Sequence, residues 1–192
     1  LGAVGLCFPI IVIITAFSNL FGTGGAPLFS IFRGKKDPDT AKRIMNTSFT
    51  MLCVCAMILM AVGFLFARPI LILFGASAEA IIYAYPYMML YLIGTLPSMI
   101  AVGMNPFINA QGFGKMGMCT VALGAVVNIV LDPIFMFGLG LGTAGAGIAT
   151  ALSQSISFCI LLSMFLRGKT VSQFRLSAVT REPREFLQIL AG

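Results

Sequence analysis

The stretch from Ile44 to Ala67 reads IMNTSFTMLCVCAMILMAVGFLFA and contains no charged residue. A helix needs about 20 predominantly apolar residues to cross the hydrocarbon core of a bilayer. A strand of a membrane β-barrel would instead alternate polar and apolar residues over about 10 positions, and this stretch does not alternate. It therefore predicts a membrane-spanning helix.

The rest of the chain has the same character. Of its 192 residues, 59% are hydrophobic and only 9% are charged, whereas a soluble domain has about 25% charged residues. So few charged side chains cannot cover a water-facing surface, and we expect an all-α integral membrane protein. The uncharged runs place about five transmembrane helices, near residues 5–32, 46–68, 82–105, 117–138 and 144–166.

The basic residues between these spans gather on one side of the membrane. If the helices alternate in direction, Arg68 is alone on its side, and the positive-inside rule places the other side in the cytoplasm. That side holds eleven basic residues, which are Arg33, Lys35, Lys36, Lys42, Arg43, Lys115, Arg167, Lys169, Arg175, Arg181 and Arg184. The bias is typical of membrane topology, so we do not expect nucleic acid as a partner. We expect a multi-pass protein of the plasma (inner) membrane, with residues 167–192 in the cytoplasm.

This orientation puts Leu1 on the outer side of the membrane, so we expect at least one further helix before it. The apolar ending FLQILAG, Phe186 to Gly192, indicates that another apolar segment begins there. The stretch TREPREFLQIL, which overlaps it, is typical of a short amphipathic helix at the inner surface. The chain is therefore expected to be a fragment of a longer transmembrane protein.

Several local signals predict how the helices begin, bend and pack. Pro38 is expected to end one element, and Asp39 or Thr40 to cap the next helix. Pro97 lies in the middle of the third span, where its missing N–H should cause a kink. The glycine cluster FGTGGAPLFS, Phe21 to Ser30, and the small residues between Gly142 and Ser157 predict close approaches between helices.

One carboxylate lies deep in an apolar region. Asp132 is the only charged residue between Met116 and Leu166. A charge near the bilayer centre costs roughly 3 kcal/mol or more, and such residues by default mark a pathway or relay. Asn128 lies four residues earlier and shares its helix face. A plainer interpretation also stays open, in which Asp132 lies near the outer end of its helix and reaches interfacial water.

The residues around this carboxylate suit a hard cation. The carboxylate, the Asn128 amide oxygen and the Thr150 hydroxyl are oxygen donors that suit a proton or an alkali cation and not a soft metal. Pro133 lacks an N–H, so the carbonyl of Ile129 would be a further free oxygen. Asn128, Asp132 and Thr150 are therefore the predicted cation- or proton-binding residues of an ion-coupled carrier.

An enzyme would need a nucleophile–base pair, a metal cluster or paired carboxylates. The chain has no histidine, a single acidic residue within the predicted spans, and five cysteines that all lie inside spans. Cysteines in such places are typically small buried residues. We therefore expect neither an enzyme nor a metal site, disulfide or bound cofactor.

Taken together, the sequence resembles the multidrug and toxic compound extrusion (MATE) family. The supporting stretches are GTGGAPLFS at 22–30, RGKKDPDTAKR at 33–43 and NPFINAQGFGKM at 105–116, and the most specific one is NIVLDPIFMFGLGLGTAGAGIATALSQ at 128–154. The resemblance implies that residues 1–166 are helices two to six of the amino-terminal, six-helix lobe of a twelve-helix carrier. Residues 167–192 would be the inter-lobe linker and the start of the second lobe.

By that resemblance, the parent protein exports organic, often cationic compounds such as drugs and toxins in exchange for Na⁺ or H⁺. Its partners would be these small molecules, the lipid bilayer and the remaining helices of the transporter. The resemblance also maps a cation-binding cavity onto Asn128, Asp132 and Thr150, with an acidic residue of the first helix outside this chain. The cation is expected to bias helix bending and the release of substrate.

Two other interpretations stay open. A lipid-linked precursor or polysaccharide flippase of the same superfamily would need basic residues in its cavity for a pyrophosphate, and the predicted spans contain none well inside the membrane. A membrane scaffold without transport activity is the other interpretation.

Overall fold

The computed structural model describes residues 2–167 and 183–191. Within these residues the chain is helical. In order, the elements are α1 (Gly2–Gly5), α2 (Phe8–Gly34), α3 (Pro38–Leu73), α4 (Ala78–Ile93), α5 (Thr95–Ala110), α6 (Gly114–Pro133), the π-helical turn η1 (Ile134–Gly138), α7 (Gly142–Leu166) and α8 (Pro183–Ala191).

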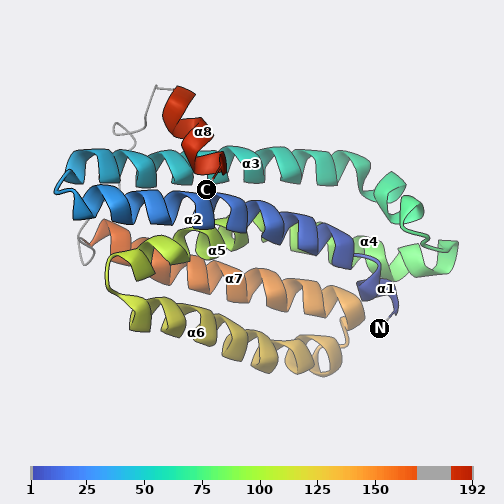
Figure 1. The fold of residues 1–192 in the computed structure, drawn as a ribbon. Helices are drawn as coiled ribbons and strands as arrows, with labels where there is room; N and C mark the ends of the chain where they lie inside the picture. Colours follow the sequence, from blue (N-terminus) through green and yellow to red (C-terminus); the bar gives the residue numbers. More distant parts are fainter. Residues whose placement is uncertain (1, 168–182, 192) are drawn as a thin grey trace.

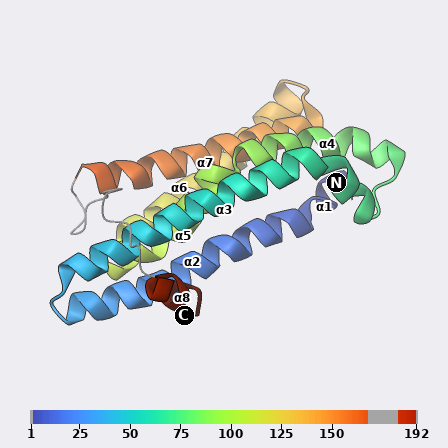
Figure 2. The same cartoon turned by 90° about the horizontal axis from the view of Figure 1, so that it is seen from above.

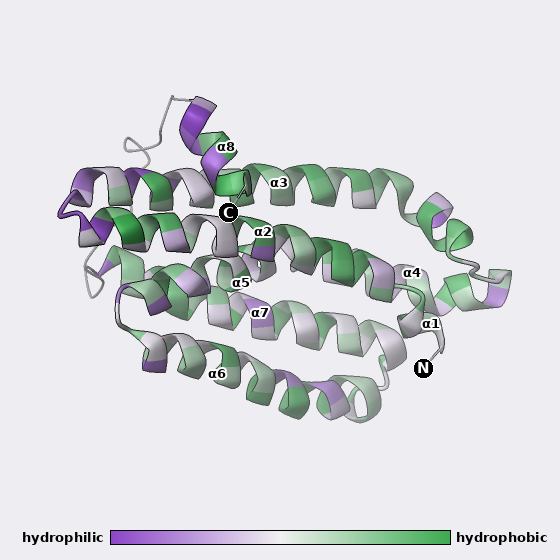
Figure 3. Ribbon diagram, in the orientation of Figure 1, coloured by the Kyte–Doolittle hydropathy of each residue, from purple (hydrophilic) through white to green (hydrophobic). Residues whose placement is uncertain are grey.

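The five predicted membrane spans are confirmed. Four helical stretches are long and apolar enough to cross a membrane, namely Gly2–Gly34, Pro38–Leu73, Gly114–Gly138 and Gly142–Leu166, and the bent pair of α4 and α5 makes a fifth. Apolar residues cover the exposed length of the bundle, while hydrophilic ones gather at the α2–α3 turn and on α8 (Figure 3). Met118, for example, is 73% exposed in the second turn of the apolar α6. The outer surface is therefore suited to lipid.

The long helices run side by side in one bundle (Figure 1). Helix α2 packs against α3 and α5, and α7 packs against α4, α5 and α6. The short α8 lies across α2 and α3 and is not aligned with the bundle (Figure 2). Helix α6 is at the edge of the bundle, and its only buried residues are Gly117 and Thr120.

The kink expected at Pro97 is confirmed, although the chain breaks three residues earlier. Helices α4 and α5 meet at Gly94 with a bend of 54°. Pro97 is the third residue of α5 and cannot donate to the carbonyl of Ile93, so a continuous helix would lose that bond. Pro69 acts similarly in α3, where Phe66, three residues earlier, has non-helical backbone angles.

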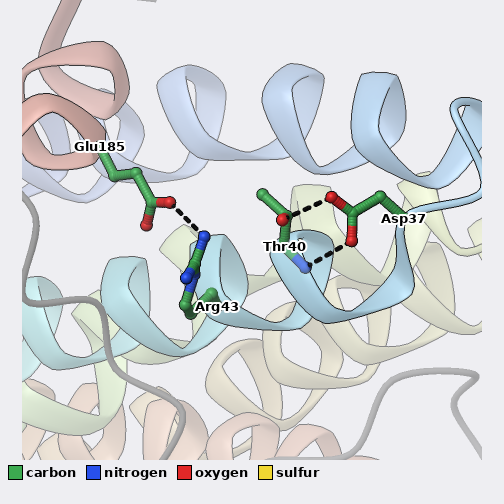
Figure 4. A network of polar contacts seen from close by, with 4 residues as sticks. All are labelled: Asp37, Thr40, Arg43 and Glu185. Atoms are coloured by element: carbon green, nitrogen blue, oxygen red, sulfur yellow. Dashed lines mark hydrogen bonds and ion pairs between the residues drawn. The ribbon is translucent and has the colours of Figure 1, made fainter.

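The prediction that Pro38 ends an element and that Asp39 or Thr40 caps the next helix was wrong by a few residues. Pro38 begins α3, where its missing N–H costs nothing, and Asp37 is the cap. The Asp37 carboxylate accepts hydrogen bonds from the backbone N–H of Thr40 at 3.1 Å and from its hydroxyl at 2.6 Å (Figure 4). The hydrogen bond from the Thr40 side chain, followed by the one from its backbone, holds the pKa of the Asp37 carboxyl below its usual value.

Replacing Asp37 by Ala is expected to fray the first turn of α3, because the amide of Thr40 loses its acceptor. Hydrogen exchange at the Thr40 amide would speed up, whereas Asp37→Ser, which keeps a capping oxygen, would leave it slow. Since the Asp37 pKa is lowered on folding, its contribution to stability is complete above the ordinary aspartate pKa and is lost as the pH falls through the lowered value. Equally slow exchange in Asp37→Ala and the native protein would contradict this role.

The core is divided into two clusters along the bundle. The larger cluster lies toward the end of the bundle with the α2–α3 turn and its lysines and arginines, here called the basic end. It includes Phe29 and Phe107, whose rings meet edge to face at 5.8 Å. The smaller one, at the other end, includes Leu71, Tyr87 and Met88. Helix α5 contributes to the first cluster and α4 to the second, so the break at Gly94 lies between them.

The expected close approach at the glycine cluster is also confirmed. A Cβ atom on Gly22 would lie 2.6 Å from the carbonyl oxygen of Gly103, and one on Gly25 would lie 2.6 Å from the Phe107 ring. Helices α2 and α5 therefore touch backbone to backbone, which only glycine at position 22 permits.

Candidate cation-binding site

The three residues predicted to bind a cation come together between α6 and α7. The Nδ2 atom of Asn128 donates to Oδ1 of Asp132, one turn along α6, at 3.4 Å. The same atom donates to Oγ1 of Thr150 on α7, also at 3.4 Å. Asn128 therefore joins the carboxylate to the hydroxyl and lies at the centre of the group.

Thr150 is held in place by its own helix. Its hydroxyl donates to the carbonyl of Ala146 at 2.9 Å, which leaves the oxygen lone pairs free to accept from Asn128. The small-residue face predicted for α7 makes this proximity possible. Ser153 and Ser157 of that face are buried, and Ser157 donates to the carbonyl of Thr120 on α6 at 3.2 Å.

A cavity of about 220 Å³ with a mixed polar and apolar lining extends from this group toward the basic end of the bundle. Residues of α5, α6 and α7 line it, and the polar ones are Thr120, Asn128, Thr150, Ser153, Gln154 and Ser157. The carboxylate of Asp132 lies one helical turn beyond the lining residue Asn128 and contacts it. The side chain of Asp132 is partly buried.

The backbone is irregular just beyond the carboxylate. Pro133 ends α6 and is followed at once by the five-residue π-turn η1, in which the N–H of Leu139 donates to the carbonyl of Ile134 at 2.9 Å. Such π-turns are rare and are often found at functional sites. Pro133 has no N–H to offer to the carbonyl of Ile129, so the spare oxygen expected at Ile129 stays a prediction.

Sequence reasoning missed one residue of the group. Tyr87 of α4 is 6% exposed and is close enough to interact with the Thr150 side chain and with the charge of Asp132. Its ring stacks on that of Tyr91 at 6.2 Å. A signal was present in the sequence, because all four tyrosines of the chain lie between Tyr83 and Tyr91.

For the cation site that the resemblance implies, we expect Tyr87→Phe to weaken ion binding without abolishing it, because the change removes the hydroxyl beside Thr150 and keeps the ring. A polar contact of this kind contributes about 0.5–1.5 kcal/mol, so the ion concentration for half-maximal efflux, the activity that the resemblance implies for the full-length protein, should rise about 2- to 10-fold. Tyr83→Phe is the matched control, since Tyr83 lies on the same helix and is 59% exposed. An identical shift in both variants would remove Tyr87 from the site.

The comparisons with known proteins agree with this geometry. The family model MatE matches residues 1–134, which is more than half of the chain. The chain belongs to the MatE family. The resemblance noted in the sequence is therefore confirmed, and the chain is a multi-pass membrane protein.

The relatives of this MatE chain are longer proteins. The multidrug export protein MepA of Staphylococcus haemolyticus is 29% identical over 174 residues, which cover 91% of the chain and 38% of that protein. The MepA protein of Staphylococcus saprophyticus is 26% identical over 187 residues, 97% of the chain and 41% of that protein. The chain thus spans about two fifths of the length of these relatives.

Solved structures of MATE transporters have the same fold. An inward-facing conformation of a multidrug resistance MATE family transporter matches with a TM-score of 0.93 and 26% identity, over 98% of the chain and 43% of that protein. An outward-facing conformation of such a transporter matches with a TM-score of 0.92 and 26% identity, over 99% and 42%. The expected fold, about five spans forming most of one six-helix lobe of a MATE-like carrier, is confirmed.

The division of the chain at residue 166 remains a prediction. Helix α7 ends at Leu166, and most of the predicted linker, with Lys169, Arg175 and Arg181, lies outside the described residues.

Proposed function

We propose that the protein containing this chain is an antiporter that exports organic, often cationic compounds by alternating access, in exchange for Na⁺ or H⁺. One observation carries the ion coupling, namely that Asn128 joins the membrane-embedded Asp132 to Thr150 through hydrogen bonds. Membership of a transporter family and the names of the MepA relatives support export of drugs and argue against an enzyme.

The geometry suggests how a cation would bind. The Asn128 amide directs its N–H groups at the carboxylate and the hydroxyl, which partly compensates the negative charge while no cation is bound. A sodium ion would need oxygen ligands, so we expect the amide to rotate and present Oδ1 beside the oxygens of Asp132 and Thr150. A proton would instead bind to the carboxylate directly. Either event removes a charge from a low-dielectric environment.

This neutralisation is the proposed link to the transport cycle. An ionised carboxylate favours the state in which the cavity is hydrated, because desolvation of a charge is costly. A neutral site can be closed off from water at lower cost, so ion binding would shift the balance between the two access states. The cavity lining contains no Lys or Arg, so a pyrophosphate-linked substrate, which the flippase alternative requires, is not favoured.

The test uses the full-length protein in inside-out membrane vesicles with a fluorescent organic cation. We expect transport of this cation into the vesicle lumen when Na⁺ or H⁺ is made more concentrated in the lumen than outside. One of the two ion gradients should be clearly more effective. Collapse of the effective gradient with the matching ionophore should stop transport. Transport that is unchanged without either gradient would contradict the proposal.

A further inference from the structure

Helix α8 is the last element of the chain, but it packs on helices from the first part of the sequence. It lies across α2 and α3 (Figures 1 and 2). Its two buried residues, Glu185 and Ile189, are one turn apart and share the face that contacts the bundle. Leu187 and Leu190 on its other faces are exposed. A helix of nine residues is marginal by itself, so its position depends on these two contacts.

The polar contact of α8 is an ion pair with α3. Nη2 of Arg43 donates to Oε1 of Glu185 at 2.7 Å, between residues 142 positions apart in the chain (Figure 4). No other salt bridge is found within residues 2–167 and 183–191. The Glu185 side chain is only 11% exposed and that of Arg43 40%. A buried carboxylate is costly without its partner, so Arg43 permits Glu185, and with it α8, to lie here.

The pairing is incomplete. Nε of Arg43 and Oε2 of Glu185 are both buried without a partner, so only one of the two bonds of a bidentate arginine–carboxylate pair is formed. Such a contact specifies one position for α8 and adds less stability than a complete pair. Removing one partner would leave the other as an unpaired buried charge. Removing one partner should therefore weaken the docking of α8 more than removing both.

The chain, with α8 inside the compared stretch, resembles transporters in two access states. The chain matches the inward-facing and the outward-facing transporter structures over 98% and 99% of its length. The unmatched one or two per cent is shorter than the nine residues of α8, so both matches extend into this helix. The fold that includes α8 is therefore similar to both access states.

We propose that Arg43 and Glu185 are positioning residues that keep α8 fixed on α2 and α3 through the transport cycle. Helix α8 then moves as part of the bundle and does not serve as the hinge. The inference rests on the proposed function, because it assigns the ion pair a role in the alternation between access states. It concerns a contact remote from Asp132, at the end of the bundle that carries the basic residues.

The experiment measures attachment and transport separately in the full-length protein. Hydrogen exchange of the amides of residues 186–190 in lipid nanodiscs reports whether α8 is docked. Efflux in vesicles reports the cycle. The variants are Arg43→Glu, Glu185→Arg and the double exchange of the two charges. Lys42→Glu is the matched control, since it makes the same charge change one residue away, and Lys42 is in no ion pair within the described residues.

Each single reversal should speed exchange in α8 about tenfold or more and reduce efflux several-fold, because two like charges then face each other. The double exchange should restore both to within about twofold, and Lys42→Glu should change neither. Rescue by the double exchange is not expected of two residues that merely fill space. If a single reversal prevents membrane insertion, Arg43→Gln and Glu185→Gln replace the reversals, with the same expected loss of protection.

Slow exchange in the single variants, or no rescue by the double exchange, would overturn the attachment. Fast exchange with undiminished efflux would overturn its role in transport while leaving the proposed antiporter intact. If the native protein shows no ion-driven efflux, the proposed function fails, and the exchange measurement still decides whether Arg43 and Glu185 hold α8.

Discussion

Replacing Asp132 by Asn should abolish gradient-driven efflux by the full-length protein while leaving its amount in the membrane unchanged. Asparagine has nearly the same shape and can keep a contact with Asn128, but it neither exchanges a proton nor neutralises a cation. Losing the charge that holds a desolvated cation removes several kcal/mol of binding, and each 1.4 kcal/mol is a factor of ten. Apparent ion affinity should therefore fall about a hundredfold or more.

The matched control is Glu79→Gln. Glu79 is exposed at the start of α4, and its replacement also removes one carboxylate without a change of shape. We expect Glu79→Gln to leave efflux and ion dependence unaltered. If Asp132→Asn also transports normally under both gradients, Asp132 is an interfacial residue, and the coupling site lies outside Asn128, Asp132 and Thr150.

Replacing Gly22 by Val should strongly destabilise the bundle. The new Cβ would be 2.6 Å from the Gly103 carbonyl oxygen and 3.2 Å from its Cα, and backbone atoms cannot move aside as a flexible side chain can. Overpacking of a core typically costs 1–3 kcal/mol, and forcing two helix backbones apart should cost about 3 kcal/mol or more. That is a large part of the stability of a typical protein.

Gly34→Val is the control for this substitution. Gly34 is in the same helix, and a Cβ there would meet nothing within 4 Å. The yield of monodisperse protein in mild detergent and its melting temperature should fall sharply for Gly22→Val and only slightly for Gly34→Val. Comparable melting temperatures would show that α2 and α5 can separate without loss of the fold.

Much of the architecture follows from patterns that are local in the sequence. Uncharged runs of the required length predict the spans, because the bilayer imposes a single length scale on every helix. The spacing of Asn128 and Asp132 places both on one face, because the helical period does so wherever the helix packs. The glycine cluster around Gly22 indicates a close contact, since few other roles suit small residues inside a membrane helix.

The missed features depend on choices that the local sequence leaves open. Asp37, Asp39 and Thr40 are all chemically able to cap α3, and the position of Pro38 in the first turn decides among them. Tyr87 joins the site only because α4 packs on α7. The pair of Arg43 and Glu185 joins elements 142 residues apart, and no periodicity in the sequence connects them.

The break at Gly94 has a consequence for how this lobe can diverge among related proteins. A continuous helix would tie its two ends together, since a rotation that repacks one end would turn the side chains of the other. With one glycine between α4 and α5, the cluster around Tyr87 and the cluster around Phe107 can change their side chains separately. Substitutions can therefore accumulate at the end that carries Asp132 while the end that holds α8 keeps its geometry.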